Sequence, residues 1–574
     1  MMNKLYPLMM IVAMAHGLGA EDAVSPTATT FCNPLDISYR FQLEEPSRRE
    51  AADPTVVWFR DRYYLFASKS GGYWHSQDLI RWEFIETDGI PTEEYAPCAV
   101  ALDDTLFFLA SSNEKSTLYK SDDPLSGKWS VAREELNRPV WDPAFYLDED
   151  GRLYLYWGCS DVNPIYGVEV DVERNFEFIG EPVPLIHQNP ARLGWENPGD
   201  YNTLTKQRPW IEGPWMNKRN GVYYLQYAGP GTEFKSYADG VYTSEHALGP
   251  FQYQPHNPFA HKPEGFAAGA GHGSTFQDRH GNYWHIGTVT ISQKHMFERR
   301  LALFPTWFAG DGTLYTDTRY GDFPLRMPQK AGATWEDVFP GWMLLSFGKP
   351  VKVSSEIEGH PSGNMNDEDI RSYWAAASGG DGEWAMMDLG AECEIRAIQL
   401  NFAEHNTRLF GREQGIVHRY TVLASDDGDA WIPIVERSAN RTDNSHAYFE
   451  ISDGLRCRYL KVVNHEVPGG HFAMSGFRVF GNGVGLKPHG VSDLKALRNP
   501  DDRRCVTLEW SSSEDAVGHV IRYGISPDQL HHSYMVYRDR SVTIRSLDSE
   551  MHYFYTIETF NENGITPSGL LVED

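Results

Sequence analysis

The feature that most constrains the fold of this chain is a short theme repeated five times between Pro34 and Pro328. In each copy a polar or Pro-containing start leads into a strand, a tight charged or Gly-bearing turn, and a second strand rich in aromatic residues. Five such hairpin units, with no extended helical periodicity, predict an all-β, five-bladed propeller, because radial repetition protects the edges of the sheets. The copies read ADPTVVWFRDRYYLFAS from Ala52, APCAVALDDTLFFLAS from Ala96, WDPAFYLDEDGRLYLYWG from Trp141, IEGPWMNKRNGVYYLQYA from Ile211 and GHGSTFQDRHGNYWHIG from Gly271.

The first residues of the copies are unusual for a propeller channel, which needs only small or apolar side chains there. Four of the five copies place a titratable residue at or near that point, namely Asp53, Asp142, Glu212 and His272. An Asp-Pro pair can simply begin a turn or cap a strand, so one copy alone carries little weight. Three carboxylates at equivalent positions of three units are harder to explain structurally. Because the innermost strands of a propeller face a common channel, we expect these carboxylates to meet there.

Three carboxylates in one channel are the residue types that hydrolysis of a glycosidic bond requires. One carboxylic acid protonates the departing oxygen, and a second carboxylate activates a water molecule or attacks directly. An inverting enzyme holds this pair about 6.5–9.5 Å apart so that the water fits between them. A third carboxylate nearby raises the pKa of the acid by like-charge repulsion. The residues therefore indicate a glycosidase with three distinct acidic roles.

The motifs ADPTV at Ala52, WDPAFYLDEDGRLYLYWG at Trp141 and EGPW at Glu212 resemble those of glycoside hydrolase family 43. Members of that family are five-bladed propellers that act, with inversion, on polysaccharides containing arabinose and xylose. The resemblance implies that Asp53 is the general base, that Asp142 modulates and orients the acid, and that Glu212 is the general acid. We expect an exo-acting enzyme that trims side chains of plant polysaccharides, an α-L-arabinofuranosidase first, with β-xylosidase and β-D-galactofuranosidase as alternatives.

Several further residues are candidates for contact with the sugar. Trp74, in GGYWHSQDLIRW, and Trp141 are predicted stacking platforms, because aromatic planes pack against the apolar faces of sugar rings. Arg299, or its neighbour Arg300, could bind substrate hydroxyls or pair with a catalytic carboxylate. His272 resembles a family position whose imidazole contacts a calcium or sodium ion directly or through water; the alternative is a hydrogen-bonded structural residue. The chemistry is expected to need no cofactor, with at most a structural ion in the channel.

The sequence pattern changes after Trp342. Residues 347–483 read as short strands with Gly and Asn turns, and SYWAA, EWAMMDLG, RYLKV and FRVFG resemble discoidin-like (factor V/VIII C-type) domains that serve as carbohydrate-binding modules. In that fold Trp374 and Trp384 would be packing residues. Residues 491–574, with VTLEW, IRYGISPDQL and YTIETFNENG, resemble a fibronectin type III domain. The predicted organisation is a propeller catalytic domain over 32–330, followed by two β-sandwiches.

The N-terminus has the build of a cleavable signal peptide over residues 1–20. Lys4 precedes an apolar run from Leu5 to Ala15, which is followed by small residues and is too short to span a bilayer. No later stretch approaches about 18 consecutive apolar residues. We therefore expect export to the periplasm, the cell surface or the medium, and no membrane span.

The six cysteines are scattered without any CxxC pair, so the sequence does not indicate a metal–thiolate site. Cys98 and Cys159 sit in strand-like apolar surroundings and are expected to be free buried thiols. Cys393 and Cys457 share one predicted domain and could form a disulfide, which export would permit.

The charge balance bounds the partners. The chain has 51 Lys and Arg against 79 Asp and Glu, a net charge of -28, so it should repel phosphate backbones and anionic membranes. Nucleic acid is therefore excluded, and an oligosaccharide or polysaccharide is the expected partner; nothing in the sequence indicates an oligomeric state. The alternative from another class is a non-catalytic glycan-binding protein, which the loss of an acid would support, but all three acids are present.

Overall fold

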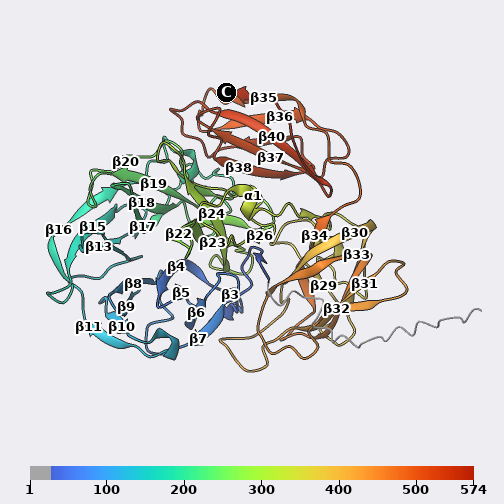
Figure 1. Ribbon diagram of the computed structural model, residues 1–574, viewed down its shortest axis with the longest axis horizontal. Coiled ribbons are helices and arrows are strands. Elements are labelled where there is room, and N and C mark those ends of the chain that lie inside the picture. The colour runs from blue at the N-terminus through green and yellow to red at the C-terminus, as the bar shows by residue number, and fades with distance from the viewer. Residues whose placement is uncertain (1–27) are drawn as a thin grey trace, which may run out of the picture.

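The computed structural model describes residues 28–574, which are almost entirely β-structure (Figure 1). The predicted signal peptide, residues 1–20, lies outside the described residues. None of the helices within 28–574 has the length and apolar character needed to cross a membrane. The helical segments of this part are η2 (Pro124–Ser126), η3 (Gly194–Glu196), α1 (Trp335–Val338) and η4 (Ser362–Met365).

Five antiparallel sheets, each built on four strands, follow one another along the chain and form the predicted five-bladed propeller (Figure 1). Blade one holds β4 (Ala52–Phe59), β5 (Arg62–Ser68), β6 (Gly72–Ser76) and β7 (Glu83–Glu86); blade two holds β8 (Cys98–Leu102), β9 (Thr105–Leu109), β10 (Leu118–Ser121) and β11 (Ser130–Arg133). Blade three holds β12 (Ala144–Leu147), β13 (Leu153–Trp157), β15 (Ile165–Asp171) and β16 (Glu177–Ile186). Blade four holds β17 (Ile211–Arg219), β18 (Val222–Gly229), β19 (Ala238–Ser244) and β20 (Gln252–Tyr253), with β14 (Cys159–Ser160) paired to β17 and β21 (Ala260–His261) paired to β19. Blade five holds β22 (Ala268–Gln277), β23 (Tyr283–Thr290), β24 (Arg299–Phe308) and β25 (Leu314–Thr316).

The first strand of each blade is the innermost one. These five strands contact one another in chain order, and β22 returns to contact β4, so that they close a ring. Successive side chains of a strand point to opposite faces of its blade. In blade three, Leu153 and Leu155 therefore face blade two, while Tyr154 and Tyr156 face blade four. An apolar core fills each of the five gaps between blades.

Short strands flank the propeller and fasten its ends. β1 (Thr30–Phe31) pairs with β26 (Leu325–Arg326), which brings the start of the described chain to the end of the propeller. β2 (Arg40–Phe41) pairs with β3 (Arg49–Glu50) just ahead of blade one.

The second domain is the predicted discoidin-like β-sandwich. Its long strands β30 and β33 pair with different partners along their two halves, so that one hydrogen-bonded sheet folds into two layers around a single core. The strands are β27 (Met343–Leu344), β28 (Val351–Val353), β29 (Trp374–Ala375), β30 (Trp384–Phe402), β31 (Arg419–Ser425), β32 (Ile432–Glu436), β33 (His446–Glu466) and β34 (Ala473–Asn482).

Two expectations for this domain can be compared with the structure. Trp374 is fully buried in the core, as predicted, whereas Trp384 is only half-buried and lies under the ammonium group of Lys461, 4.4 Å from the ring centroid. Cys393 and Cys457 stand directly opposite each other on β30 and β33, yet both are free thiols.

The third domain is a smaller sandwich of two sheets around a core that includes Trp510, Tyr523 and Tyr555. One sheet has the order β35-β36-β39, and the other has the order β38-β37-β40-β41 with β42 added to β40. The strands are β35 (Ser492–Arg498), β36 (Val506–Ser511), β37 (Gly518–Gly524), β38 (His532–Tyr537), β39 (Ser541–Ile544), β40 (Phe554–Asn561), β41 (Gly564–Pro567) and β42 (Val572–Glu573).

The three domains pack against one another rather than hanging on linkers (Figure 1). One apolar cluster joins Tyr320 of the propeller segment, Phe480 of the second domain and Phe560 of the third. Arg49, next to blade one, forms ion pairs with Glu404 of the second domain at 2.6 Å and with Asp443 at 2.7 Å. These contacts hold the second domain against the side of the propeller.

Candidate active site

A residue in the left-handed backbone conformation lies in the inner strand of every blade or two residues before it. Its φ is 53° at Asp53, 46° at Ala96, 49° at Asp142, 56° at Gly213 and 44° at His272. Each is followed by Pro or Gly, and the register of the inner strand shifts at this point in blades one, four and five. Because a positive φ is uncommon for residues other than glycine, the surrounding structure must hold these positions in place.

Glu212 differs from this pattern. The prediction that the three carboxylates occupy equivalent positions is wrong for Glu212, because Gly213 takes the left-handed position of blade four. Glu212 therefore corresponds to Trp141, the residue that precedes Asp142 in blade three. A Cβ on Gly213 would lie 2.4 Å from Cδ2 of His272, so only glycine lets the imidazole approach the chain beside the acid.

A polar side chain of the preceding blade holds the left-handed residue in four blades. In each case the backbone N–H of that residue donates a hydrogen bond to a hydroxyl or carboxylate oxygen. The pairs are Asp53 with Thr288 Oγ1 (2.9 Å), Ala96 with Ser68 Oγ (2.7 Å), Asp142 with Ser111 Oγ (2.8 Å) and His272 with Asp239 Oδ1 (2.7 Å). Each of these four residues is thus fastened to the preceding blade.

Three polar side chains surround the Asp53 carboxylate. The Ser68 hydroxyl donates to Oδ2 at 2.5 Å, the Arg299 guanidinium donates to Oδ1 at 3.2 Å, and His272 Nδ1 lies 3.4 Å from Oδ1. Arg299 is itself held by the buried Glu50 at 2.7 Å. The prediction that Arg299 pairs with a catalytic carboxylate is consistent with this position, while Arg300 points away and donates to His446.

Asp142 and Glu212 form a close pair with Cys159. One oxygen of each carboxylate and the Cys159 sulfur lie within 4.8 Å of one another. The Cys159 thiol donates to Glu212 Oε2 at 3.2 Å, and the Tyr237 hydroxyl donates to Oε1. Cys159 is a free thiol as predicted, but its surroundings are acidic rather than apolar, because β14 pairs it directly opposite Glu212.

His272 lies between the two aspartates. Its Nδ1 is 3.4 Å from Asp53 and 3.7 Å from an oxygen of Asp142. Burial alone lowers the pKa of an imidazole, but here Asp53, Asp142 and Glu212 outweigh burial and raise the pKa of His272. The imidazolium therefore partly offsets the charge of the carboxylates around it.

Burial is also the main influence on Asp142, and it raises the pKa of this carboxyl to about 7. The imidazole of His272 opposes that effect, whereas the charges of Glu212 and Asp53 add to it. The Asp142 carboxyl therefore keeps its proton up to about neutral pH.

We expect Asp142→Asn to stabilise the fold at alkaline pH and to have little effect near pH 4. At pH 4 the folded carboxyl, with a pKa of about 7, is neutral, and the unfolded one, with a pKa of about 3.9, is only about half ionised, so the penalty for its charge is small. The penalty grows as the pH rises from about 4 to 7. The amide carries no such penalty, so the free energy of unfolding at pH 8 should rise on the order of 2–4 kcal/mol. Urea unfolding at pH 4.5 and pH 8 measures the difference, with the exposed turn variant Asp103→Asn as control. Destabilisation that is equal at both pH values would contradict the assignment.

One pocket, with a volume of about 320 Å³, is lined by the polar residues described above, namely Asp53, Asp142, Cys159, Glu212, His272 and Arg299. Its walls include Trp141 and Trp210, whose side chains are 38% and 47% exposed, together with Tyr95, Met296 and Phe297. Trp141 is thus where the sequence predicted it. Tyr95 and Trp210 were missed, although Tyr95 precedes Ala96 as Trp141 precedes Asp142, and Trp210 lies two residues before Glu212.

The prediction for Trp74 is wrong. Its side chain is fully buried in the core between blades five and one, with its ring edge against Phe84 and its indole N–H 3.4 Å from Ser38 Oγ. Trp74 belongs to β6, the third strand of its blade, and side chains of that strand point sideways between blades.

The second domain supports two loops of the pocket. Arg371 donates to Asp200 at 2.6 Å and to the backbone oxygen of Glu233, a pocket residue, at 3.3 Å. The Gln293 side chain donates to the Arg371 backbone oxygen, and Lys294 donates to the backbone oxygens of Ala403 and Glu404, each at 3.2 Å. The loop that follows Lys294 carries Met296 and Phe297, so one wall of the pocket is built on the neighbouring domain.

We expect Arg371→Ala to raise KM about tenfold for small aryl glycosides with a smaller change in kcat, because it frees the loop that carries Glu233 without touching the acids. Steady-state kinetics measures this, with thermal unfolding as a check on the fold. Arg456→Ala is the matched control, since Arg456 pairs with the exposed Glu392 in the same domain. Identical kinetics for both variants would show that the second domain does not shape the pocket.

Two of the three domains match the models of known protein families. Residues 47–314 match the model of Glycosyl hydrolases family 43, and residues 350–475 match that of the F5/8 type C domain. Residues 47–314 include all five inner strands and the carboxylates Asp53, Asp142 and Glu212.

Curated relatives match at low identity, and three of them illustrate the range. A "Xylan 1,3-beta-xylosidase" of a Vibrio species and a "Xylosidase/arabinosidase" of Butyrivibrio fibrisolvens are each 26% identical over 269 residues, covering 40% and 41% of this chain. A "Beta-D-galactofuranosidase" of Aspergillus niger is 25% identical over 260 residues, covering 39% of this chain and 69% of its own length. The match spans only 46% and 48% of the first two relatives. The chain therefore contains a glycosyl hydrolases family 43 domain, in which the acids lie, followed by an F5/8 type C domain.

Proposed function

We propose that this chain is an exo-acting, inverting glycoside hydrolase that removes side-chain sugars from plant polysaccharides. The observation that carries the proposal is the gathering of Asp53, Asp142 and Glu212 around His272 in one small pocket with aromatic walls. A volume of about 320 Å³ lies at the low end of the range for ligand sites, roughly 300–1,000 Å³, which suits one terminal sugar rather than a chain passing through.

The acids divide the work in this proposal. Asp53 takes a proton from water as that water attacks the anomeric carbon, and the Arg299 and His272 charges beside it fix its orientation. Glu212 protonates the departing oxygen, held in place by the Tyr237 hydroxyl and the Cys159 thiol. Asp142 lies beside Glu212, and because burial raises its pKa to about 7, its carboxyl holds a proton in the pocket up to about neutral pH.

The sugar is proposed from the sequence and from the names of relatives. We propose α-L-arabinofuranose first; β-D-xylose and β-D-galactofuranose are the alternatives that the relatives named xylosidase and galactofuranosidase favour. Initial rates on aryl α-L-arabinofuranoside, β-D-xyloside and β-D-galactofuranoside, followed by arabinan, arabinoxylan and arabinogalactan, test the choice. Hydrolysis of none of these, together with binding of one of the polymers, would favour a non-catalytic glycan-binding protein instead.

Three accompanying assignments belong to the same proposal. The F5/8 type C domain is proposed to bind carbohydrate, and the third domain, a two-sheet sandwich, is proposed to be of the fibronectin type III kind. Export is proposed from the apolar N-terminal segment.

The chemistry proposed here needs no metal ion. The Nδ1 side of His272 faces two carboxylates, and its raised pKa favours the protonated imidazole, a poor ligand. Calcium needs six to eight oxygen ligands, and the closest cluster of ligand-type atoms includes a thiol, Cys159. We expect chelator treatment to leave kcat/KM and the thermal midpoint unchanged. A loss of activity that calcium restores would overturn this and return His272 to an ion site.

A further inference from the structure

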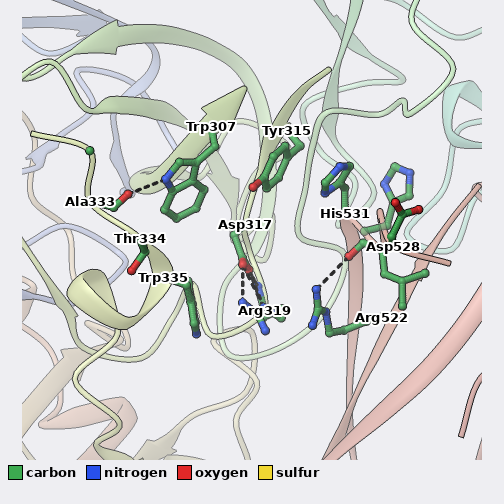
Figure 2. A pocket seen from close by; sticks show the side chains of 13 residues that line it. Trp307, Tyr315, Asp317, Arg319, Ala333, Thr334, Trp335, Arg522, Asp528 and His531 are labelled. Atoms are coloured by element: carbon green, nitrogen blue, oxygen red, sulfur yellow. Dashed lines mark hydrogen bonds and ion pairs between the residues drawn. The ribbon is translucent and has the colours of Figure 1, made fainter. Parts of the chain in front are cut away.

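A second cavity, of about 510 Å³, lies between blade five of the propeller and the third domain (Figure 2). The propeller side supplies Trp307 and Tyr315, the segment after it supplies Trp335, and the third domain supplies Arg522 and His531. We call this cavity the interdomain cleft. Its size falls within the usual range of ligand sites, roughly 300–1,000 Å³.

The interdomain cleft is separate from the candidate active site. Arg299, in the active pocket, and Trp307, in the cleft, lie near opposite ends of the ten-residue strand β24. At about 3.3 Å per residue they are roughly 25 Å apart along the strand. A ligand in the cleft would therefore not touch the catalytic acids.

An array of rings lines one side of the cleft. Trp307 and Tyr315 are cross-strand neighbours on β24 and β25, with ring centroids 6.0 Å apart and planes 28° from parallel. Tyr315 stacks on His531 with centroids 3.9 Å apart and planes at 14°. Figure 2 shows these three rings in a row, with Trp335, Arg319 and Arg522 in a second row opposite them. Aromatic rings can contact the apolar CH groups of a sugar, while the polar groups opposite them can bind its hydroxyls.

The charged groups of the cleft are compensated. Asp317 accepts hydrogen bonds from the Arg319 guanidinium at 2.7–3.0 Å, and both Arg319 and Arg522 approach Glu558, at 3.1 and 3.4 Å. Asp528 adds a further negative charge to the lining. Since no cation is left without an acid, the cleft favours a neutral ligand over a phosphate or a uronic acid.

Polar atoms in the cleft lack partners. Nε2 of His531, Nε2 of His532 and Nε of Arg522 are buried and unpartnered among the residues described, and His532 is only 6% exposed. Burial lowers the pKa of His531 to about 4 and that of His532 well below its ordinary value, so both rings are neutral at pH 7. An unpaired buried polar atom is costly, and ligand hydroxyl groups can supply the missing hydrogen bonds.

We propose that the interdomain cleft is a second carbohydrate site, which binds a neutral saccharide segment between the propeller and the third domain. The choice of a saccharide rests on the proposed function; the existence of a site rests on the ring array and the unpartnered nitrogens. Such a site would hold a polymer chain while the distant pocket cleaves, and would act independently of the F5/8 type C domain.

Binding in full-length chains that carry Asp53→Asn tests the proposal without interference from hydrolysis. Mobility in native gels containing arabinan, arabinoxylan or arabinogalactan gives an apparent Kd for each polymer. Adding Tyr315→Ala, which removes the central ring, should weaken binding to at least one polymer about tenfold, whereas Tyr315→Phe should bind as the parent does. Leu530→Trp, which fills the cleft from the third domain, should also weaken binding about tenfold. If Tyr315→Ala fails to fold, the Leu530→Trp variant tests whether the cleft binds saccharide.

Unchanged apparent Kd values for both cleft variants on all three polymers would overturn the proposal, as would binding only of an acidic polymer such as polygalacturonate. A second readout uses chains with native Asp53. Tyr315→Ala should leave kcat/KM on aryl glycosides within twofold of the native value but lower the rate on the bound polymer. Absence of aryl glycoside hydrolysis in the native chain would remove the proposed function, while the gel assay would still decide whether the cleft binds saccharide.

Discussion

Replacing Glu212 by Gln should lower kcat/KM on unactivated oligosaccharides about 10³–10⁴-fold, yet lower it far less on dinitrophenyl glycosides. The amide fills the same space beside Tyr237 and Cys159 but has no proton to give to the departing oxygen. An unactivated sugar alkoxide cannot leave without that proton, whereas dinitrophenolate leaves unaided. The measurement is kcat/KM on two substrates that differ only in the leaving group.

Glu233→Gln is the matched control for Glu212→Gln, because Glu233 is another carboxyl group of the same pocket that has no assigned proton transfer. It should change both substrates by a similar, smaller factor. An equal loss on both substrates for Glu212→Gln would show that Glu212 is not the proton donor.

Asp53→Asn should lower kcat/KM by about 10³-fold or more on both kinds of substrate, because a water that is not activated attacks too slowly whichever group departs. The substitution keeps the shape of the side chain between Ser68 and Arg299. Asp61→Asn, at the exposed turn of the same blade, is the matched control and should retain native rates, since Asn tolerates the left-handed conformation found there.

Mass spectrometry of the native chain after incubation with a 2-fluoroglycoside separates a base from a nucleophile at Asp53. A base forms no bond to the sugar, so no adduct is expected. A stable sugar adduct on Asp53 would instead make this residue a nucleophile.

The propeller was accessible from the sequence because its signal is local. Each blade begins with a hairpin whose turn residues and alternating strands are contiguous in the chain, so five copies predicted five sheets in the observed order. The Asp-Pro starts identified Asp53 and Asp142, since the proline that follows each one marks the left-handed position. In blade four the same position is occupied by Gly213, and the acid lies one residue earlier, which a comparison of carboxylates alone misses.

What the sequence did not predict depends on contacts between distant segments. Cys159 meets Glu212 only because β14 joins the sheet of the next blade, and Tyr237 meets it from the loop that leads into β19 of that sheet. Arg371 supports the pocket from 171 residues beyond its partner Asp200. Trp74 failed as a prediction because it lies on β6, the third strand of its blade, where side chains point between blades and not into the channel.

The stereochemistry of the first product tests the central claim most directly. In an NMR time course of aryl glycoside hydrolysis by the native chain, the released sugar should first appear with the anomeric configuration opposite to that of the substrate, before mutarotation mixes the two forms. That result is expected if Asp53 activates water while Glu212 protonates the departing oxygen. First appearance of the sugar with retained configuration would contradict the assignment of Asp53 as base, and release of no sugar from any of the three glycosides would contradict the proposed activity.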